Sequence, residues 1–363
     1  MSESLKKSGK NLPHHNNNSR PDAGADANTM RVPIHSEDTP ELGVREFVFR
    51  SPAMRAIYSI ALQVAGSDAS VLVYGESGTG KELFARLLHT LSDRNARPFV
   101  PVNCGILQGE LFADKFFGHE AGAFTGAARQ HKGAFEGAAN GTLFLDEVGE
   151  IPPANQVDFL RVLEERSFRR MGGEKDIPFQ ARIVAATNRP LNRMVREGAF
   201  RADLFYRLNV VPVALPPLRA RSEDIPLLAE HAFSLFRHRY HRHDLRLHDS
   251  VLDFFLRYSW PGNVRELRNL MERLVLLAKD DEITAEHLPL EMRFTAREEH
   301  PDQGPAQTGD MRLEAAVREA EIRAIVRALK HSGGKKKKAA SLLDISERAL
   351  RYKLARYAIG AFL

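Results

Sequence analysis

Residues 71–82 read VLVYGESGTGKE, a short apolar run followed by a glycine-rich turn and a lysine. An apolar run of this length that ends at glycine is typical of a buried strand. The spacing Gly75-x-x-x-x-Gly80-Lys81 is that of a phosphate-binding loop, in which backbone N–H groups surround the phosphates and the lysine reaches the outer ones. A helix that begins near Glu82 would direct its positive end at the same phosphates. We therefore expect ATP to bind at Gly75, Glu76, Ser77, Gly78, Thr79, Gly80, Lys81 and Glu82.

Three further apolar runs predict strands, and each of them ends in a polar residue. They are PFVPVN (98–103), TLFLDE (142–147) and RIVAATN (182–188). Because helix-like patterns alternate with these runs, we expect an α/β fold whose strands are buried on both faces. Asp146 and Glu147 at one strand tip suit one carboxylate on Mg²⁺ and one that orients the attacking water. Thr187 and Asn188 at another tip are candidates for contact with the γ-phosphate or its water.

The chain of 363 residues divides into five stretches of different character. Residues 1–44 contain almost no large apolar residues, which predicts a disordered arm. Residues 45–213 carry the α/β pattern, and residues 214–292 show a helical pattern only. Residues 293–311 are polar with proline and glycine, as in a linker. Residues 312–363 predict a small all-α domain.

Composition excludes several classes of protein. No apolar run approaches the roughly 20 residues of a membrane span, so no membrane partner is expected. The N-terminus has no apolar signal-peptide core. The single cysteine, Cys104, permits no internal disulfide. These features favour a reducing, cytoplasmic location.

Positive charge is concentrated at the C-terminus. Residues 311–363 hold thirteen Lys and Arg against five Asp and Glu, a net charge of +8, whereas the whole chain carries +5. An excess of this kind matches a DNA backbone. Helix, glycine pair, helix, turn and helix follow one another, with an expected core of Leu342, Leu343, Ile345, Leu350 and Leu354. The expected DNA-binding residues are Lys335, Lys336, Lys337, Lys338, Arg348, Arg351, Tyr352 and Lys353.

The stretch GAFTGA (122–127) places Phe124 and Thr125 between glycines. Glycine on both sides disfavours a helix interior and a strand alike. An aromatic side chain on such a loop is a candidate anchor for a partner protein.

Five motifs occur in one order along the chain: GESGTGKE, GAFTGA, GTLFLDE, FRADLFYRL and WPGNVREL. Together they resemble the AAA+ activators of sigma-54 RNA polymerase, the bacterial enhancer-binding proteins of the NtrC type. The resemblance covers about residues 46–290. The C-terminal domain resembles, more loosely, the Fis-type helix-turn-helix. The two resemblances together imply an AAA+ P-loop ATPase core with a helical lid, followed by a helix-turn-helix domain.

The resemblance also implies a role for the glycine-flanked loop. In this family the loop rides on a helix hairpin, and its Phe and Thr contact sigma-54; these are Phe124 and Thr125 here. A second loop, Arg170 to Pro178, matches the one that supports it. The residues implied in sigma-54 contact are Gly122, Ala123, Phe124, Thr125, Gly126 and Ala127.

Further roles are implied for single residues. Asn103 matches the residue that restrains Glu147, and Arg265 matches the lid arginine that reads the nucleotide. Arg201 and Arg207 match arginines presented to the nucleotide of a neighbouring subunit, which implies self-assembly, from dimer to hexameric ring. The implied partners are the sigma-54 RNA polymerase holoenzyme and upstream enhancer DNA. The implied cofactors are ATP and Mg²⁺.

The chain departs from the family pattern at two places and from the general phosphate-loop pattern at a third. A run like SELFGHE usually precedes the loop, whereas DKFFGHE (114–120) stands here, so we expect packing changes. Glu82 replaces the usual Ser/Thr of phosphate loops but is normal in this family, so Asp146 is the expected Mg²⁺ ligand. Ala349, Arg351 and Tyr352 differ from common Fis-type residues, so the DNA sequence preference does not carry over.

The residues leave two alternative functions open. One is a DNA-binding regulator whose AAA+ core only drives oligomerisation. The other is a general AAA+ ATPase that remodels other proteins. Many relatives carry an N-terminal receiver or sensing domain, but only about 45 residues precede the ATPase here. We therefore expect control by a separate regulatory protein, by heteromerisation or by expression level.

A histidine-rich stretch is a weak candidate for a metal site. His238, His241, His243 and His248 lie close together in RHRYHRHDLRLH. A metal site needs convergent ligands, so we interpret them as a solvated basic helix end.

Overall fold

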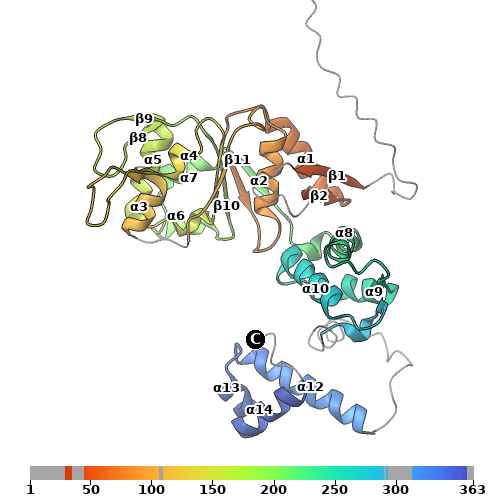
Figure 1. The fold of residues 1–363 in the computed structure, drawn as a ribbon. Helices are drawn as coiled ribbons and strands as arrows, with labels where there is room; N and C mark the ends of the chain where they lie inside the picture. The colour runs from red at the N-terminus through yellow and green to blue at the C-terminus, as the bar shows by residue number, and fades with distance from the viewer. Residues whose placement is uncertain (1–28, 35–44, 106–108, 290–291, 293–312, 358–363) are drawn as a thin grey trace, which may run out of the picture.

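A five-stranded parallel sheet organises the first half of the molecule (Figure 1). The computed structural model describes residues 29–34, 45–105, 109–289, 292 and 313–357. The strand order is β11-β3-β10-β7-β4, so strands distant in sequence lie side by side. The four strands expected from the sequence are confirmed. The fifth strand, β11, is not among the runs that the sequence analysis predicts as strands. Their bounds are β3 Val71–Tyr74, β4 Phe99–Asn103, β7 Thr142–Asp146, β10 Arg182–Thr187 and β11 Val211–Ala214.

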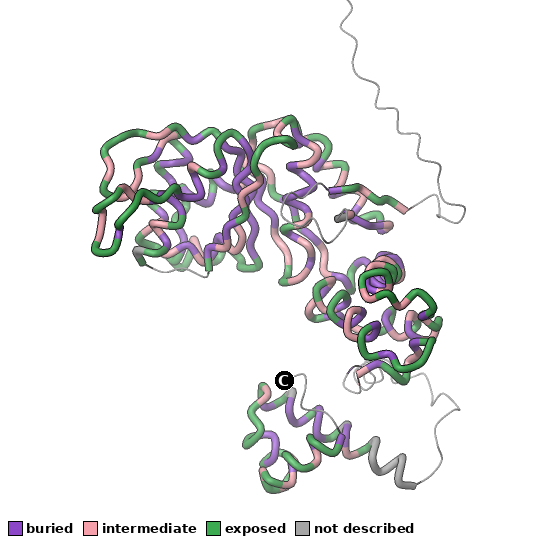
Figure 2. Tube along the Cα trace, in the orientation of Figure 1, coloured by how far each residue is buried: buried purple, intermediate pink, exposed green. Residues whose placement is uncertain are grey.

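Both faces of the sheet are covered, which explains the continuous apolar runs. Side chains of Val71 and Val73 enter one core with Phe84, whereas Leu72 enters the other core with Phe159. The purple strands in the centre of Figure 2 reflect this burial on both sides. Parallel strands buried in this way need helices on each face. The helices are α1 Pro52–Val64, α2 Lys81–Thr90, α5 Pro153–Glu165, α6 Leu191–Arg196 and α7 Ala202–Leu208.

An insertion between β4 and β7 carries the glycine-flanked loop. The family resemblance implies a helix hairpin here, but the loop itself extends from a short antiparallel strand pair between two helices. Gly118 pairs with Lys132, and His119 pairs with His131. A second strand pair lies between α5 and β10. The elements are α3 Glu110–Phe117, β5 Gly118–His119, β6 His131–Lys132, α4 Ala134–Gly137, β8 Ser167–Phe168 and β9 Ile177–Pro178.

The expectation of a disordered arm over residues 1–44 is wrong for its described part. Strand β1, Met30–Ile34, pairs antiparallel with β2, Arg45–Phe49. Ile34 is buried in one core cluster with Phe47. A five-residue strand is not stable alone in water, and its partner strand supplies the ladder and the apolar contact. Residues 1–28 and 35–44 of the arm lie outside the described residues.

Helices α8, α9 and α10 form the lid around the buried indole of Trp260. The expected helical lid is confirmed, and a short parallel strand pair also joins two of the lid's connections. Isolated two-residue strands leave no periodic signal in the sequence. The bounds are α8 Asp224–Arg239, β12 Arg246–Leu247, α9 Asp249–Arg257, α10 Asn263–Leu277 and β13 Glu282–Ile283.

The carboxylate of Asp224 joins the lid to the N-terminus of α1. It is fully buried and accepts hydrogen bonds from the N–H groups of Arg50 (2.6 Å) and Ser51 (2.7 Å). The Ser51 hydroxyl donates a third, at 2.8 Å. Because Ser51 is also the N-cap of α1, the lid residue completes the cap.

We expect Asp224→Ala to lower the free energy of unfolding by about 1.5–3 kcal/mol, because buried donors lose a charged acceptor. Urea denaturation followed by circular dichroism measures the loss. Asp253→Ala, at an exposed position of α9, is the control and is expected to be neutral. Equal midpoints for wild type and Asp224→Ala would contradict this assignment.

Three helices form the C-terminal domain: α12 Leu313–His331, α13 Lys336–Leu342 and α14 Glu347–Arg356. Leu350 and Leu354 are buried as expected, and Leu343 and Ile345 are partly buried. Leu342 is wrong as a core residue, since 56% of it is exposed. It lies in the last turn of α13, where Ala339 and Ala340 occupy the buried positions. None of the described helices combines the length and apolar character needed to cross a bilayer.

Candidate functional site

The carboxyl ends of the parallel strands bring the expected nucleotide residues to one edge of the sheet. Asn103 and Asp146 are register partners at the ends of β4 and β7, and Thr187 and Tyr74 are partners at the ends of β10 and β3. Lys81 begins α2 directly after β3 and its loop. Its Nζ lies 3.6 Å from a carboxylate oxygen of Glu147. The phosphate loop and the acidic strand tip therefore face each other.

The phosphate loop has the backbone that its glycines permit. Gly78 has φ +80° and Gly80 has φ +101°, which L side chains rarely adopt. The lysine side chain is 7% exposed, and its Nζ donates to the carbonyl oxygens of Gly75 (3.0 Å) and Glu76 (3.4 Å). The loop thus holds a desolvated ammonium at the N-terminus of a helix of ten residues. This combination suits a polyphosphate.

Glu147 has an unusual backbone and two defined partners. Its φ of +53° is in the left-handed region, outside the usual range for a non-glycine residue. One carboxylate oxygen faces Lys81, and the other accepts the N–H of Asn188 at 3.2 Å. The side-chain oxygen of Asn103, expected to restrain Glu147, accepts the N–H of Gly105 instead. Glu147 is therefore oriented by β10 and the phosphate loop in this conformation.

Asp146 ends β7 and carries a carboxylate, the kind of ligand that Mg²⁺ prefers. Burial first, and then the neighbouring Glu147 carboxylate, raise the pKa of Asp146. Asp146 and Glu147 are both half-buried, and two neighbouring carboxylates are stabilised by a cation, so the donor set fits Mg²⁺. Glu82 points its carboxylate to Arg86 at 2.9 Å. Thr187 is buried, and its hydroxyl accepts the N–H of Arg189 at 3.0 Å, which supports the turn.

The lid contacts the phosphate loop through several polar side chains. Arg265, expected to read the nucleotide, donates to the hydroxyl of Ser77 at 2.9 Å. Arg219 and Asn263 hydrogen-bond to Glu76 and lower the pKa of that carboxyl to about 2. Sequence reasoning missed both residues. Arg219 follows β11 in the run PPLRAR. The two arginines of this run, Arg219 and Arg221, were the available signal.

The two arginines expected to act on a neighbouring subunit lie at the two ends of α7, Arg201 at its N-cap and Arg207 in its last turn. Arg201 is exposed and pairs with Asp203 at 2.7 Å. Arg207 is exposed and donates to the carbonyl oxygen of Leu163 at 3.0 Å. Neither interaction involves residues 75–82. The surface between them displays Tyr206, which is 72% exposed.

The glycine-flanked loop is closed on itself and leaves one side chain outside. The N–H of Gly122 donates to the carbonyl oxygen of Ala127 at 2.8 Å, so the motif's ends meet. Thr125 is exposed, whereas Phe124 is half-buried with its ring edge-on to His119, 4.8 Å between centroids. The expected bare aromatic is thus partly covered. Thr125 remains the accessible tip.

The second loop supports the first through its backbone and one arginine. The N–H of Glu120 donates to the carbonyl oxygen of Met171 at 3.0 Å. The N–H of Met171 donates to the carbonyl oxygen of Gly118 at 2.9 Å. Arg170 joins the carboxylates of Glu120 (2.5 Å) and Glu136 (2.8 Å). A side chain at Gly172 would collide with Ala123 at 2.8 Å. The two loops are therefore one packed unit.

Basic side chains line the last two helices. Lys335 to Lys338 are exposed at the N-terminus of α13, and Arg348, Arg351 and Tyr352 are exposed on α14. Arg351 pairs with Glu347 at 2.5 Å. Lys353, expected to bind DNA, donates to Glu321 at 2.7 Å. This hydrogen bond joins α14 to α12.

The histidine-rich stretch of the lid does not converge. Within the described residues, the side chains near enough to hold a metal ion are Asp114, His119 and His131, and none comes from this stretch. His248 caps α9 by accepting the N–H of Ser250.

Comparisons with known proteins cover all three parts of the chain. Residues 47–214 match the family model described as the Sigma-54 interaction domain. Residues 219–305 match the AAA+ ATPase lid domain, and residues 316–357 match the Bacterial regulatory protein, Fis family.

Curated relatives and a solved structure agree with this division. The chain is 45% identical to the regulatory protein AtoC of Escherichia coli, over 85% of this chain and 67% of that protein. It is 42% identical to the transcriptional regulatory protein ZraR of E. coli, over 89% and 72%. It is 43% identical to the nitrogen fixation protein AnfA of Azotobacter vinelandii, over 85% of this chain but 57% of that protein. NtrX from Brucella abortus in complex with ATP superposes with a TM-score of 0.63 at 34% identity, over 86% of this chain and 69% of NtrX. The chain belongs to the sigma-54-dependent transcriptional activators, with an AAA+ ATPase domain that binds ATP, a helical lid and a Fis-type helix-turn-helix that binds DNA.

Proposed function

We propose that this activator hydrolyses ATP to remodel closed complexes of sigma-54 RNA polymerase, while bound to upstream enhancer DNA. The observation that carries the proposal is the packed double loop with Thr125 at its exposed tip, in the same domain as Lys81 and Glu147. A loop fastened by Arg170 and by backbone hydrogen bonds to a second loop moves as a unit. Such a unit can transmit a change at the nucleotide site to a partner protein.

Each nucleotide residue has a role in this scheme. The backbone of Gly75 to Gly80 and the Nζ of Lys81 bind the phosphates, and Arg265 binds them from the lid. Asp146 would hold Mg²⁺, which when bound neutralises phosphate charge. Glu147 accepts a proton from the attacking water, and Asn188 orients Glu147 through its backbone N–H. Asn103 is proposed to restrain Glu147 in another state of the cycle.

Arg201 and Arg207 complete the site of a neighbouring subunit. Both are exposed, and their hydrogen-bond partners are Asp203 and the carbonyl oxygen of Leu163 rather than residues 75–82, which favours action in trans. The active species is then a ring, for which we propose six subunits. It works in the bacterial cytoplasm on the nucleoid.

Trapping sigma-54 on the loop tests the proposal. With ATP held in a form that resembles the transition state, wild type is expected to retain purified sigma-54 in a pull-down. Thr125→Ala and Phe124→Ala are expected to lose it. Arg129→Ala, an exposed position of the same hairpin outside the motif, is the matched control. Retention by all variants would remove the loop from the account.

We expect Lys335→Ala with Lys337→Ala to weaken binding to every DNA duplex about equally. Each lost phosphate contact should reduce the slope of log affinity against log salt by about 1. Fluorescence anisotropy at several salt concentrations measures the slope. Lys279→Ala, an exposed lysine of the lid, is the control. An unchanged slope in the double variant would contradict phosphate contact at these lysines.

A further inference from the structure

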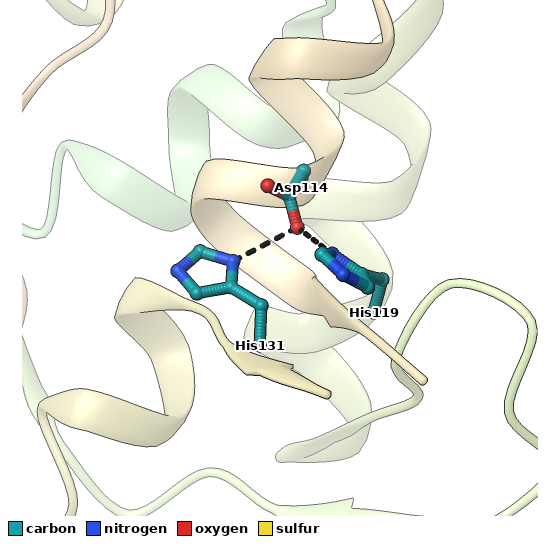
Figure 3. Close-up of side chains that lie close together, drawn as sticks. All are labelled: Asp114, His119 and His131. Atoms are coloured by element: carbon teal, nitrogen blue, oxygen red, sulfur yellow. Dashed lines mark hydrogen bonds and ion pairs between the residues drawn. The ribbon is translucent and has the colours of Figure 1, made fainter. Parts of the chain in front are cut away.

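Three side chains with metal-binding atoms converge at the base of the loop (Figure 3). Asp114 lies on α3, and His119 and His131 are direct partners in β5 and β6. One carboxylate oxygen of Asp114 lies 2.6 Å from Nδ1 of His119 and 2.9 Å from Nδ1 of His131. All three candidate ligand atoms lie within 4.8 Å of one another. The nucleotide and DNA sites use none of these residues.

We propose that Asp114, His119 and His131 bind a divalent transition-metal ion, with Zn²⁺ the best match. Two imidazole nitrogens and one carboxylate oxygen are a donor set typical of Zn²⁺, and water can fill the remaining position. Mg²⁺ and Ca²⁺ prefer all-oxygen sites and do not fit two imidazoles. An ion at this place needs the Nδ1 lone pair of each histidine, so both rings bind it as the neutral tautomer whose proton is on Nε2.

The geometry requires only a small adjustment. Ligands about 2.0–2.2 Å from a tetrahedral ion are about 3.3 Å apart. The present separations of 2.6 and 2.9 Å must therefore widen by about 0.7 and about 0.4 Å, which rotation of the side chains can supply. His119 is 12% exposed and Asp114 21%, whereas His131 is 46% exposed. Two ligands are thus held by packing, and the third lies open to an entering ion.

The departure from the family run supports a site particular to this chain. Asp114 stands first in DKFFGHE, where the usual run SELFGHE has serine. A serine there would leave two imidazoles without a carboxylate. The acidic side chain therefore completes the donor set at this position.

A bound ion would fasten both strands of the loop stem to α3. The His119 ring also packs against the ring of Phe124, with 4.8 Å between centroids. An imidazole held by the ion would therefore keep the phenyl ring in its half-buried position. Zn²⁺ would then hold the loop down and oppose the release of Phe124 toward a partner. This consequence rests on the proposed function of the loop, whereas the metal site does not.

Titration of the full chain with the metal alone tests the site. The protein is stripped with a chelator and titrated with ZnCl₂ by calorimetry, without nucleotide or sigma-54. Co²⁺ serves as a second probe, because its visible absorption reports tetrahedral coordination by nitrogen. We expect Asp114→Asn and His131→Asn each to weaken the tightest site at least about 100-fold. His241→Asn, in the lid's histidine-rich stretch, is the control and should bind as wild type does.

Hydrogen exchange adds a readout at the loop itself. Zn²⁺ should slow amide exchange in residues 118–132 of wild type but not in either variant, and thermal melting shows whether the variants fold. Binding that is unchanged in both variants, or a wild type that binds no ion, overturns the proposal. If the site binds Zn²⁺ but sigma-54 retention does not respond, only the consequence for the loop fails.

Discussion

Glu147→Gln is expected to lower kcat for ATP hydrolysis by about 10²–10⁴-fold while ATP binding stays within a few-fold of wild type. The amide keeps the size of the side chain and can still accept the N–H of Asn188. It cannot take a proton from water, and it removes the negative charge 3.6 Å from Lys81. Phosphate release measures kcat, and a fluorescent ATP analogue measures binding.

Glu150→Gln is the matched control for this prediction. Glu150 lies three residues further on and pairs with Arg189 at 2.5 Å, on the surface of the same turn. Its loss should change kcat only a few-fold. A Glu147→Gln protein that hydrolyses ATP at a rate like that of Glu150→Gln would show that another group accepts the proton.

Arg207→Ala and Arg201→Ala are each expected to lower kcat by about 10³-fold or more, because an arginine in trans neutralises charge that develops on the γ-phosphate. Arg201 is the N-cap of α7 and pairs with Asp203 of that helix, whereas Arg207 lies in its last turn and contacts α5. Steady-state phosphate release measures the loss. Arg193→Ala, which removes an exposed ion pair with Glu197 on α6, is the control.

A mixing experiment shows whether the arginine acts between subunits. Arg207→Ala subunits keep Glu147, and Glu147→Gln subunits keep Arg207, so mixed rings contain some complete sites. ATPase activity should therefore reappear when the two inactive proteins are combined. A mixture as inactive as its components would place Arg207 in the site of its own chain.

The sequence predicts the local parts of the site well. The phosphate loop and the acidic strand tip are each defined by residues that are close in sequence. Parallel strands then bring the separate tips to one edge, so Lys81 and Glu147 could be placed together without coordinates. The backbone conformation of Glu147 could not be predicted, because the residue type of a non-glycine residue does not indicate a left-handed conformation.

Long-range polar contacts lay beyond sequence reasoning. Glu76 meets Arg219 and Asn263 from positions 143 and 187 residues away, and only the folded lid brings them together. The short strand of residues 30–34 likewise needs its partner to be stable. The cluster of Asp114, His119 and His131 depends on the register of one strand pair, which no spacing in the sequence reveals.

Open-complex formation by purified sigma-54 RNA polymerase tests the central claim most directly. The protein is added with ATP to a supercoiled promoter and to a pre-melted one, beside Thr125→Ala and Glu147→Gln. We expect wild type to open the supercoiled promoter only with ATP, and both variants to fail although Thr125→Ala still hydrolyses ATP. If Thr125→Ala opened the promoter as wild type does, or if wild type hydrolysed ATP without opening it, the account of the loop as the ATP-driven contact with sigma-54 would be contradicted.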